Sequence, residues 1–214
     1  MSRFTLLLGG DLIATQRLAA QISGTRVIAA DAGIRHAQAL GLVPELWVGD
    51  FDSTTGPLER SFLDVRREEF PADKDQTDGE LATSIALREG ATSLVMAGAF
   101  GGLRADHAFL HLALALRLAD EGIEVILTSG AQEGVPLYLG PQDFDFADDT
   151  LFSIIGLSEL SGVSVSGAKW PLNDVEVPLG SSLTISNRVK GHLHITLRAG
   201  RALLIAHPYP IEGS

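Results

Sequence analysis

The sequence predicts an α/β N-terminal domain, with a mainly parallel sheet flanked by helices, followed by a small all-β antiparallel sandwich domain. Two observations carry this prediction. Up to about residue 130, short apolar runs alternate with amphipathic helical patterns at the spacing of βαβ units. Beyond that point the helical periodicity disappears, and short strand patterns alternate with turn residues. We therefore expect the α/β domain over residues 1–132 and the β-sandwich over residues 133–214.

The strands of the parallel sheet are predicted from apolar runs that end at turn residues. These runs span residues 4–8, 26–30, 46–49, 65–70, 93–97 and 123–127. Helical patterns lie between them, over residues 12–22, 31–41, 57–63, 77–88 and 106–120. The helix that begins at Thr77 has the clearest start, because Thr77 and Glu80 have the spacing of a capping box. Leu81 and Ile85 then form its apolar stripe.

The second half of the chain is predicted to be all strands and turns. The expected strands span residues 135–139, 150–156, 161–166, 174–177, 192–198 and 202–206. Turn residues such as Gly140-Pro141 and Gly180-Ser181 separate them. Because a domain of roughly 80 residues buries a limited fraction of its surface, we expect it to pack on the first domain or on a second copy of the chain.

Composition and charge narrow the class of protein. The 214 residues carry a net charge of −11 and no cluster of Lys and Arg, which argues against a nucleic-acid partner. There is no cysteine, so disulfides, thiolate chemistry and zinc fingers are excluded. The apolar run over residues 4–8 is too short for a signal peptide or a membrane span. We therefore expect a cytoplasmic protein that does not associate with membranes.

Four aspartates in two short acidic stretches are predicted to form a metal site. They are Asp50, Asp52, Asp75 and Asp78. The first pair directly follows a strand, where alternate side chains of an extended backbone point the same way. The second pair lies three residues apart at a helix start and so shares a face. Either stretch alone is equally consistent with a solvated turn or a helix cap. Together, however, four carboxylates repel one another unless a cation lies among them, and hard oxygen ligands suit Mg²⁺.

Further ligand residues are expected at the carboxyl ends of the parallel strands, where open α/β sheets bind their ligands. These loops contribute Asp31, Gly33, Lys74, Gly101, Gly102, Arg104, Asp106 and His107. Glycines let the backbone approach a phosphate, and Arg104 can donate two hydrogen bonds to it. Alternatively, Asp31 caps a helix, and the glycine loop is a βα turn with an N-cap aspartate. Neither a G-x-G-x-x-G after the first strand nor a Walker A motif is present, so a Rossmann site and a P-loop are not supported.

In the second half, Trp170 lies in a polar, turn-rich stretch. Its ring can stack on a flat heterocycle while Ser186 and Asn187 supply hydrogen bonds. The alternative, that Trp170 anchors a core or an interface, is equally consistent with these residues. The remaining histidines show no ligand spacing, and we interpret them as structural: His36, His111, His192, His194 and His207.

Taken together, these stretches resemble the thiamine pyrophosphokinase family, and the likeness runs through nearly the whole chain. Residues 49–53 (GDFDS) look like that family's GDFDS element, and residues 74–80 (KDQTDGE) like its K-D-x-T-D-x-E element. Residues 101–107 are similar to its G-G-R-x-D-H loop. Residues 167–172 with Ser186-Asn187 are similar to its C-terminal G-x-K-[WY]-x-L … S-N pair. Each element alone is weak evidence for the family, but four elements in the family's order are specific to it.

The resemblance implies a homodimer that transfers a pyrophosphoryl group from ATP to the hydroxyethyl oxygen of thiamine, giving thiamine diphosphate and AMP. It implies that the four aspartates are catalytic and hold Mg²⁺ and the triphosphate, and that the loop residues named above bind ATP. Trp170, Ser186 and Asn187 would lie in the thiamine pocket, at or near the dimer interface. Asp52 or Asp78 is the candidate acceptor of the hydroxyl proton.

Three positions depart from the family's pattern. Ala32 stands where the family has a glycine, Leu103 is an extra residue before Arg104, and Arg188 replaces an acidic residue. The alternatives are a pyrophosphokinase for another hydroxymethyl heterocycle, such as a pterin, and a nucleotide- or vitamin-binding sensor without turnover. A metal-dependent phosphohydrolase is a third. The set of four aspartates disfavours the sensor, and the aromatic Ser-Asn pocket disfavours the phosphohydrolase.

Overall fold

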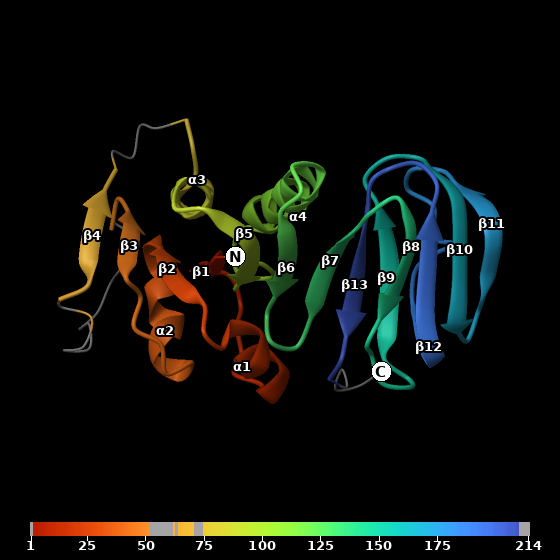
Figure 1. Cartoon of the computed structure of the whole chain (residues 1–214), viewed down its shortest axis with the longest axis horizontal. Coiled ribbons are helices and arrows are strands. Elements are labelled where there is room, and N and C mark those ends of the chain that lie inside the picture. The colour runs from red at the N-terminus through yellow and green to blue at the C-terminus, as the bar shows by residue number, and fades with distance from the viewer. Residues whose placement is uncertain (1, 52–61, 63, 71–74, 210–214) are drawn as a thin grey trace. The chain divides into compact units, whose positions relative to one another are not determined.

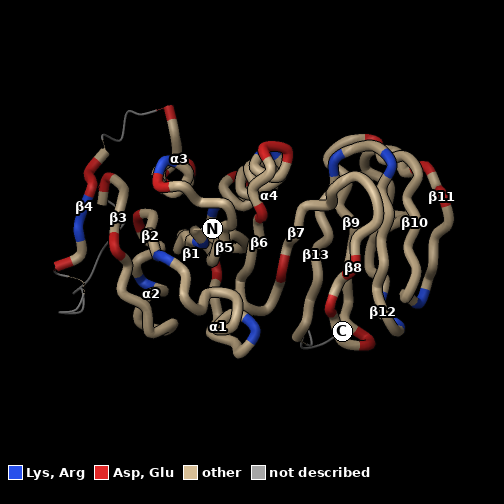
Figure 2. The backbone as a smooth tube through the Cα atoms, viewed as in Figure 1, with Lys and Arg blue, Asp and Glu red and all other residues tan. Residues whose placement is uncertain are grey.

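The computed structural model describes residues 2–51, 62, 64–70 and 75–209 (Figure 1). The chain divides into two compact units, and each is described by itself. The first consists of Met1–His111 and Glu121–Gly130, and the second of Leu112–Asp120 and Ala131–Ser214. Along the described backbone, Lys and Arg are scattered among acidic residues and do not gather into one patch (Figure 2). No helix in the described part of the chain is both long enough and apolar enough to cross a membrane.

The first unit is built on a parallel sheet. Its strands, in spatial order, are β6 (Glu124–Thr128), β5 (Ala91–Ala97), β1 (Ser2–Leu7), β2 (Arg26–Ala30), β3 (Leu46–Gly49) and β4 (Arg66–Glu69). All neighbours are parallel. The central strand is β1, whose Leu6 pairs with Ile28 on one side and with Met96 on the other. Because the strands are parallel, their carboxyl ends meet at one edge of the sheet.

Helices connect the strands of this sheet. They are α1 (Gln16–Ile22), the 3₁₀ helix η1 (Asp31–Ile34), α2 (Arg35–Ala39), α3 (Asp78–Arg88) and α4 (Ala105–Asp120). The predicted capping box is present at α3, where the Thr77 side chain accepts from the Glu80 N–H and the Glu80 carboxylate accepts from the Thr77 N–H. Helix α3 buries Leu81 and Ile85 and packs against β1, β2, β3 and β5. The predicted helix over residues 57–63 lies outside the described residues apart from Phe62, which is buried.

The second unit contains the antiparallel strands. In spatial order they are β11 (Leu172–Val177), β10 (Leu160–Ala168), β12 (Asn187–Leu197), β9 (Leu151–Gly156), β13 (Ala202–His207) and β7 (Glu133–Leu137), with β8 (Gly140–Phe144) also paired to β12. Strand β12 changes partners along its length, because Asn187 pairs with β9 while the segment from Leu193 to Leu197 pairs with β8. The core of the second unit is formed by inward-facing side chains such as Phe152 and Leu204.

The predicted fold class is confirmed: a parallel α/β N-terminal part is followed by an antiparallel β region. Strand β8 is missing from the predicted strands, because Gly140-Pro141 is typical of a turn. Proline lacks an N–H and is tolerated only where a strand has a free side. Among the described strands β8 pairs only with β12, and Pro141 lies opposite Thr196 in that pairing.

Candidate functional site

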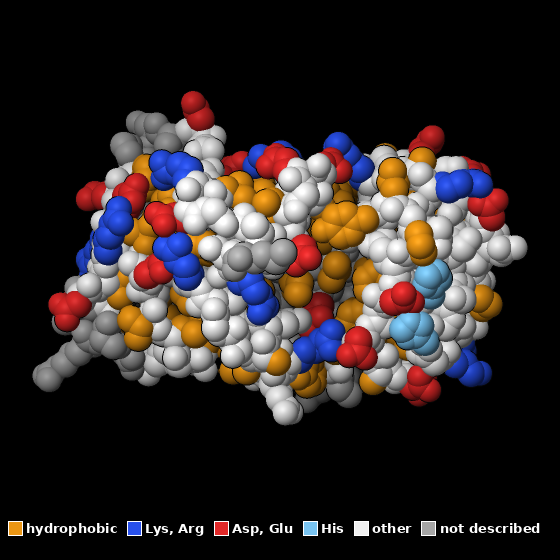
Figure 3. All heavy atoms as spheres, viewed as in Figure 1, with side chains coloured by type: hydrophobic (Ala, Val, Ile, Leu, Met, Phe, Trp, Pro, Cys, Tyr) orange, Lys and Arg blue, Asp and Glu red, His pale blue; other side chains and the backbone are white. Residues whose placement is uncertain are grey.

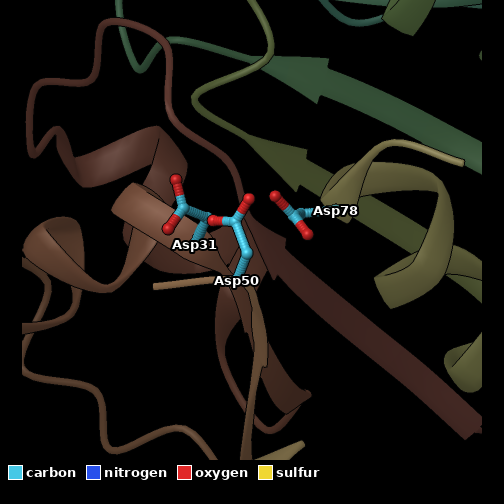
Figure 4. Close-up of side chains that lie close together, drawn as sticks. All are labelled: Asp31, Asp50 and Asp78. Atoms are coloured by element: carbon cyan, nitrogen blue, oxygen red, sulfur yellow. The ribbon is translucent and has the colours of Figure 1, made fainter. Parts of the chain in front are cut away.

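Three aspartates from different segments converge at the carboxyl edge of the parallel sheet. One carboxylate oxygen from each of Asp31, Asp50 and Asp78 lies within 4.8 Å of the others, and all three side chains are partly exposed. In Figure 4 the Asp50 and Asp78 carboxylates face each other, and Asp31 lies beside Asp50. We call these three residues the acidic centre.

The place of Asp31 is set by its own backbone and by a buried tryptophan. Asp31 directly follows β2 and has a φ of 41°, in the left-handed region that aspartate tolerates better than most residues. The Trp47 indole N–H donates to the Asp31 carbonyl at 2.9 Å. Trp47 is itself buried and packs edge-to-face on Phe51, with 4.7 Å between ring centroids. The turn that carries Asp31 is thus fixed to the core of the first unit.

Asp50 reaches the acidic centre because β3 ends in a glycine. Gly49 has a φ of 153°, and a Cβ there would lie 3.1 Å from the Asp31 Cβ. Strands β2 and β3 are parallel neighbours, with Ala30 opposite Val48. The residues that follow these two strands therefore emerge side by side, and the missing side chain at Gly49 leaves room for both carboxylates.

Asp78 is the first residue of α3. The helix start carries the partial positive charge of the aligned peptide dipoles, which favours a carboxylate or a phosphate there. The capping box of Thr77 and Glu80 fixes where the helix begins and therefore where Asp78 lies. Gly79 follows at a crowded point, because a Cβ there would approach the Leu8 and His111 side chains at 3.3 and 3.4 Å.

The donor set of the acidic centre fits a hard divalent cation such as Mg²⁺. Carboxylate oxygens are the ligands that Mg²⁺ prefers, and it typically takes one or two of them while it keeps waters and binds substrate phosphates. Asp50 and Asp78 were predicted as metal ligands, whereas Asp31 was assigned to ATP binding. Asp75 is exposed and is not one of the three described carboxylates that converge. Asp52 and Lys74 lie outside the described residues.

The glycine-rich loop after β5 is attached to the loop after β1. The Gly10 N–H donates to the Gly98 carbonyl at 2.9 Å, and the Asp11 N–H donates to the Phe100 carbonyl at 2.8 Å. The Asp11 carboxylate in turn accepts from the Gly102 N–H at 3.1 Å. These bonds hold the glycine-rich loop against the loop that follows β1, and Asp11 is a residue that sequence reasoning missed.

Arg104 and Asp106 form an exposed ion pair next to this loop. Arg104 donates from Nε to Asp106 Oδ1 at 2.9 Å and from Nη2 to Oδ2 at 2.6 Å. The hydrogen bond from Arg104 holds the pKa of Asp106 far below its usual range, and the same bond raises the pKa of Arg104. Asp106 lies in the first turn of α4, where the helix dipole also favours a carboxylate. Asp106 thus accepts two parallel hydrogen bonds from Arg104, which favours one orientation of its guanidinium group.

In the second unit, Asn187 fastens the turn that carries Trp170. The Trp170 N–H donates to Asn187 Oδ1 at 3.1 Å, and Asn187 Nδ2 donates back to the Trp170 carbonyl at 2.7 Å. Trp170 is 53% exposed, and the Lys169 ammonium lies 4.5 Å from the centroid of its ring. Ser186 has a φ of 60°, and its N–H donates to Ser153 Oγ. The buried Asn187 amide is thus engaged with backbone, while the Trp170 side chain is about half exposed and has the Lys169 ammonium over its ring.

The family resemblance implies that this loop binds ATP, so we expect Asp11→Ala to raise the KM for ATP about 3- to 10-fold with little change in kcat, because one hydrogen bond that orders the loop is lost. Asp11→Asn keeps an acceptor at the same position and removes the charge, so it should restore most of the affinity. Steady-state kinetics with varied ATP measure both. Equal KM values for the wild type and Asp11→Ala would show that the Gly102 contact does not order the loop.

His111 should make stability depend on pH. Burial lowers the pKa of His111 below its ordinary value of 6.5, and its Nδ1–H donates to the Ala99 carbonyl at 3.1 Å. The unfolded chain therefore binds the proton more readily, and the free energy of unfolding should fall as the pH drops below about 6.5. In His111→Gln this loss between pH 7 and pH 5 should be smaller. Urea unfolding of the wild type and the variant at several pH values measures this difference. An equal pH dependence in both proteins would show that His111 does not cause the loss of stability.

Comparison with known proteins relates both halves of the chain to one protein family. The model of the thiamin pyrophosphokinase catalytic domain matches residues 21–127, and that of the thiamin pyrophosphokinase vitamin B1 binding domain matches residues 142–202. A thiamine pyrophosphokinase of Bacillus subtilis is 30% identical over 184 residues, which cover 83% of this chain and 84% of that relative.

Solved structures agree with the family models. A crystal structure of thiamine pyrophosphokinase from Bacillus subtilis superposes with a TM-score of 0.84 at 25% identity, covering 96% of this chain and 99% of that one. Thiamin pyrophosphokinase from Candida albicans shares the fold at 13% identity, with a TM-score of 0.78 over 96% of this chain and 89% of that one.

Proposed function

We propose that the acidic centre binds Mg²⁺ and the ATP triphosphate, since the chain belongs to the thiamine pyrophosphokinase family. Both family domains are present, so the chain is an enzyme, a thiamine diphosphokinase. It transfers a pyrophosphoryl group from ATP to thiamine. The observation that carries the proposed site is the convergence of Asp31, Asp50 and Asp78 within 4.8 Å at the carboxyl edge of the parallel sheet.

In the proposed chemistry, the main contributions of this chain are to position ATP and thiamine and to neutralise the charge of the triphosphate. Pyrophosphoryl transfer breaks the bond between the α,β-bridging oxygen and the β-phosphorus, while the thiamine hydroxyl oxygen forms the new bond to that phosphorus. AMP leaves, and the hydroxyl proton passes to a base. Mg²⁺, when bound, neutralises charge on the triphosphate. Asp52 and Asp78 are the candidate acceptors of the proton.

The chain's own residues have separate proposed roles. Asp50, Asp78 and Asp31 hold the cation, with Asp52 and Asp75 as further carboxylates beside the triphosphate. Arg104, oriented by Asp106, donates to phosphate oxygens. The remaining proposed ATP ligands are Gly33, Lys74, Gly101, Gly102 and His107. The partly exposed start of α3 supplies a favourable dipole for the same anion.

The proposed thiamine site lies in the second unit around Trp170, Ser186 and Asn187, at or near the interface between two copies of the chain. Trp170 offers an exposed aromatic face for the heterocycle. The two hydrogen bonds between the Asn187 amide and the Trp170 backbone hold the turn that carries this face. Nearby in sequence, Leu179 and Leu183 are more than half exposed. A partner copy that packs here would remove these side chains from water.

Product analysis tests the reaction. The protein is incubated with ATP, Mg²⁺ and thiamine, and nucleotides and thiamine esters are separated by chromatography. Equal amounts of AMP and thiamine diphosphate are expected. AMP formed only with a pterin alcohol would change the substrate but keep the chemistry. Phosphate release without a diphosphorylated acceptor would indicate a phosphohydrolase, and ATP binding without products would indicate a sensor.

Mixing two inactive variants tests whether a site needs residues of both copies. We expect Asp50→Asn and Trp170→Ala each to have little activity alone. If two copies share each site, mixed dimers of the two variants contain one site with both native residues, and the mixture should regain roughly a quarter of wild-type activity. Sedimentation measures the dimer in parallel. No recovery in a mixture that forms mixed dimers would show that each copy supplies its own Trp170 and Asp50.

A further inference from the structure

Three side chains that commonly bind metal ions gather on an exposed face of the second unit, and none of them is among the residues proposed for thiamine. His192 and His194 lie two residues apart on β12, so they project from the same face of the strand. Asp143 on β8 is the direct cross-strand partner of His194. Figure 3 shows imidazole and carboxylate side chains side by side where β8 and β12 lie in Figure 1.

The three side chains meet at one carboxylate oxygen. Asp143 Oδ1 accepts from His192 Nε2 at 2.7 Å and from His194 Nδ1 at 2.9 Å. The side chains of His192, His194 and Asp143 are 71%, 38% and 62% exposed, so water can reach the cluster and complete a coordination shell. The Asp143 oxygen thus lies between the two imidazole nitrogens, and all three side chains are open enough to turn toward an ion.

We propose that His192, His194 and Asp143 form a metal site for a divalent transition-metal ion of the Zn²⁺ type, separate from the acidic centre. Imidazole nitrogen suits Zn²⁺, Cu²⁺, Ni²⁺ and Co²⁺, whereas Mg²⁺ prefers oxygen ligands alone. The two sites of the chain therefore differ in the ion they select. Two histidines and a carboxylate also leave a position for water, as an open zinc site does.

The protonation states allow such an ion to replace the present hydrogen bonds. Hydrogen bonds from His194 and His192 lower the pKa of Asp143, so the carboxylate stays ionised and available. In each neutral ring one nitrogen carries the hydrogen, and it now points to Asp143. On metal binding this hydrogen moves to the other ring nitrogen, Nδ1 of His192 and Nε2 of His194, and the freed lone pair faces the ion. The proton count of each neutral ring does not change. The exposed side chains turn so that both freed nitrogens face the ion.

A bound ion would join two strands that are otherwise held by backbone pairing. Within the described sheet β8 pairs only with β12. The ion would link Asp143 on β8 to both histidines on β12, so binding should slow the opening of β8. The site lies outside the catalytic residues proposed above, and its test does not depend on the activity.

Calorimetric titration with Zn²⁺ tests the proposal on tag-free, chelator-treated full-length protein in excess Mg²⁺, which occupies oxygen sites. The variants are His192→Gln and His194→Gln, with His207→Gln on β13 as the matched histidine control. Loss of an outer-shell partner already weakens metal binding about 10- to 100-fold. We therefore expect loss of either imidazole to weaken Zn²⁺ binding at least tenfold, and no change in the control. Co²⁺ should give visible absorption bands in the wild type that both variants lose.

Hydrogen exchange on the wild-type protein tests the same site without any substitution, so the result does not depend on the variants folding. Amides of β8, residues 140–144, should exchange more slowly with Zn²⁺ than without it. No Zn²⁺ binding in excess Mg²⁺ would overturn the proposal. Equal affinity in the wild type and in either histidine variant, or unchanged exchange over residues 140–144, would overturn it as well.

Discussion

Asp50→Asn is expected to lower kcat/KM about 10²- to 10³-fold, because it removes one of three carboxylates that converge within 4.8 Å. The side chain keeps its size, and Asp50 belongs to no helix, so capping is not affected. A lost cation ligand should also raise the Mg²⁺ concentration that gives half-maximal rate. Without Mg²⁺, the variant should be at least as stable as the wild type, since the substitution removes repulsion among carboxylates.

Steady-state kinetics with varied Mg²⁺, together with thermal unfolding with and without Mg²⁺ and ATP, separate this role from a structural one. Asp64→Asn is the matched control, because it changes an exposed aspartate of the same unit that is not in the acidic centre. Its activity and Mg²⁺ dependence should equal those of the wild type. If Asp50→Asn lost activity with an unchanged Mg²⁺ requirement, the assignment of Asp50 as a cation ligand would be wrong.

Gly33→Ala is expected to destabilise the protein by about 3 kcal/mol or more, because a Cβ at this position would overlap the Leu7 carbonyl oxygen. Gly33 is buried in η1, directly against β1. The overlap is with backbone, so no change of side-chain rotamer can relieve it. The segment that follows β2 would have to move, and Asp31 would move with it, so catalysis should fall as well.

Denaturant unfolding of the wild type and the variant measures this effect. Gly9→Ala is the control, since a Cβ there would have only the Ala32 Cβ near it, at 4.0 Å. We expect the control to stay within about 1 kcal/mol of the wild type. A Gly33→Ala protein as stable as the control would mean that η1 can shift without cost, and the close contact of η1 with β1 would then not position Asp31.

Local patterns in the sequence were sufficient for most elements of the first unit. The apolar runs at 26–30 and 46–49 coincide with β2 and β3, and the capping box at Thr77 and Glu80 marks the start of α3. These features succeed because hydrophobic periodicity and capping are decided within a few residues of one another. The missed strand β8 has no such signal, since Pro141 lowers its strand propensity and only pairing with β12 makes it a strand.

The sequence by itself determined the fold class and the family, and it predicted the residues of a phosphate and metal site. Tertiary structure decided which of those residues meet. Asp31 and Asp50 converge because β2 and β3 pair in parallel and Gly49 leaves space between them. Asp143 meets His194 through the register of β8 on β12, although 51 residues separate them. Distances of this kind follow from strand pairing and close packing, which a linear pattern of residue types does not specify.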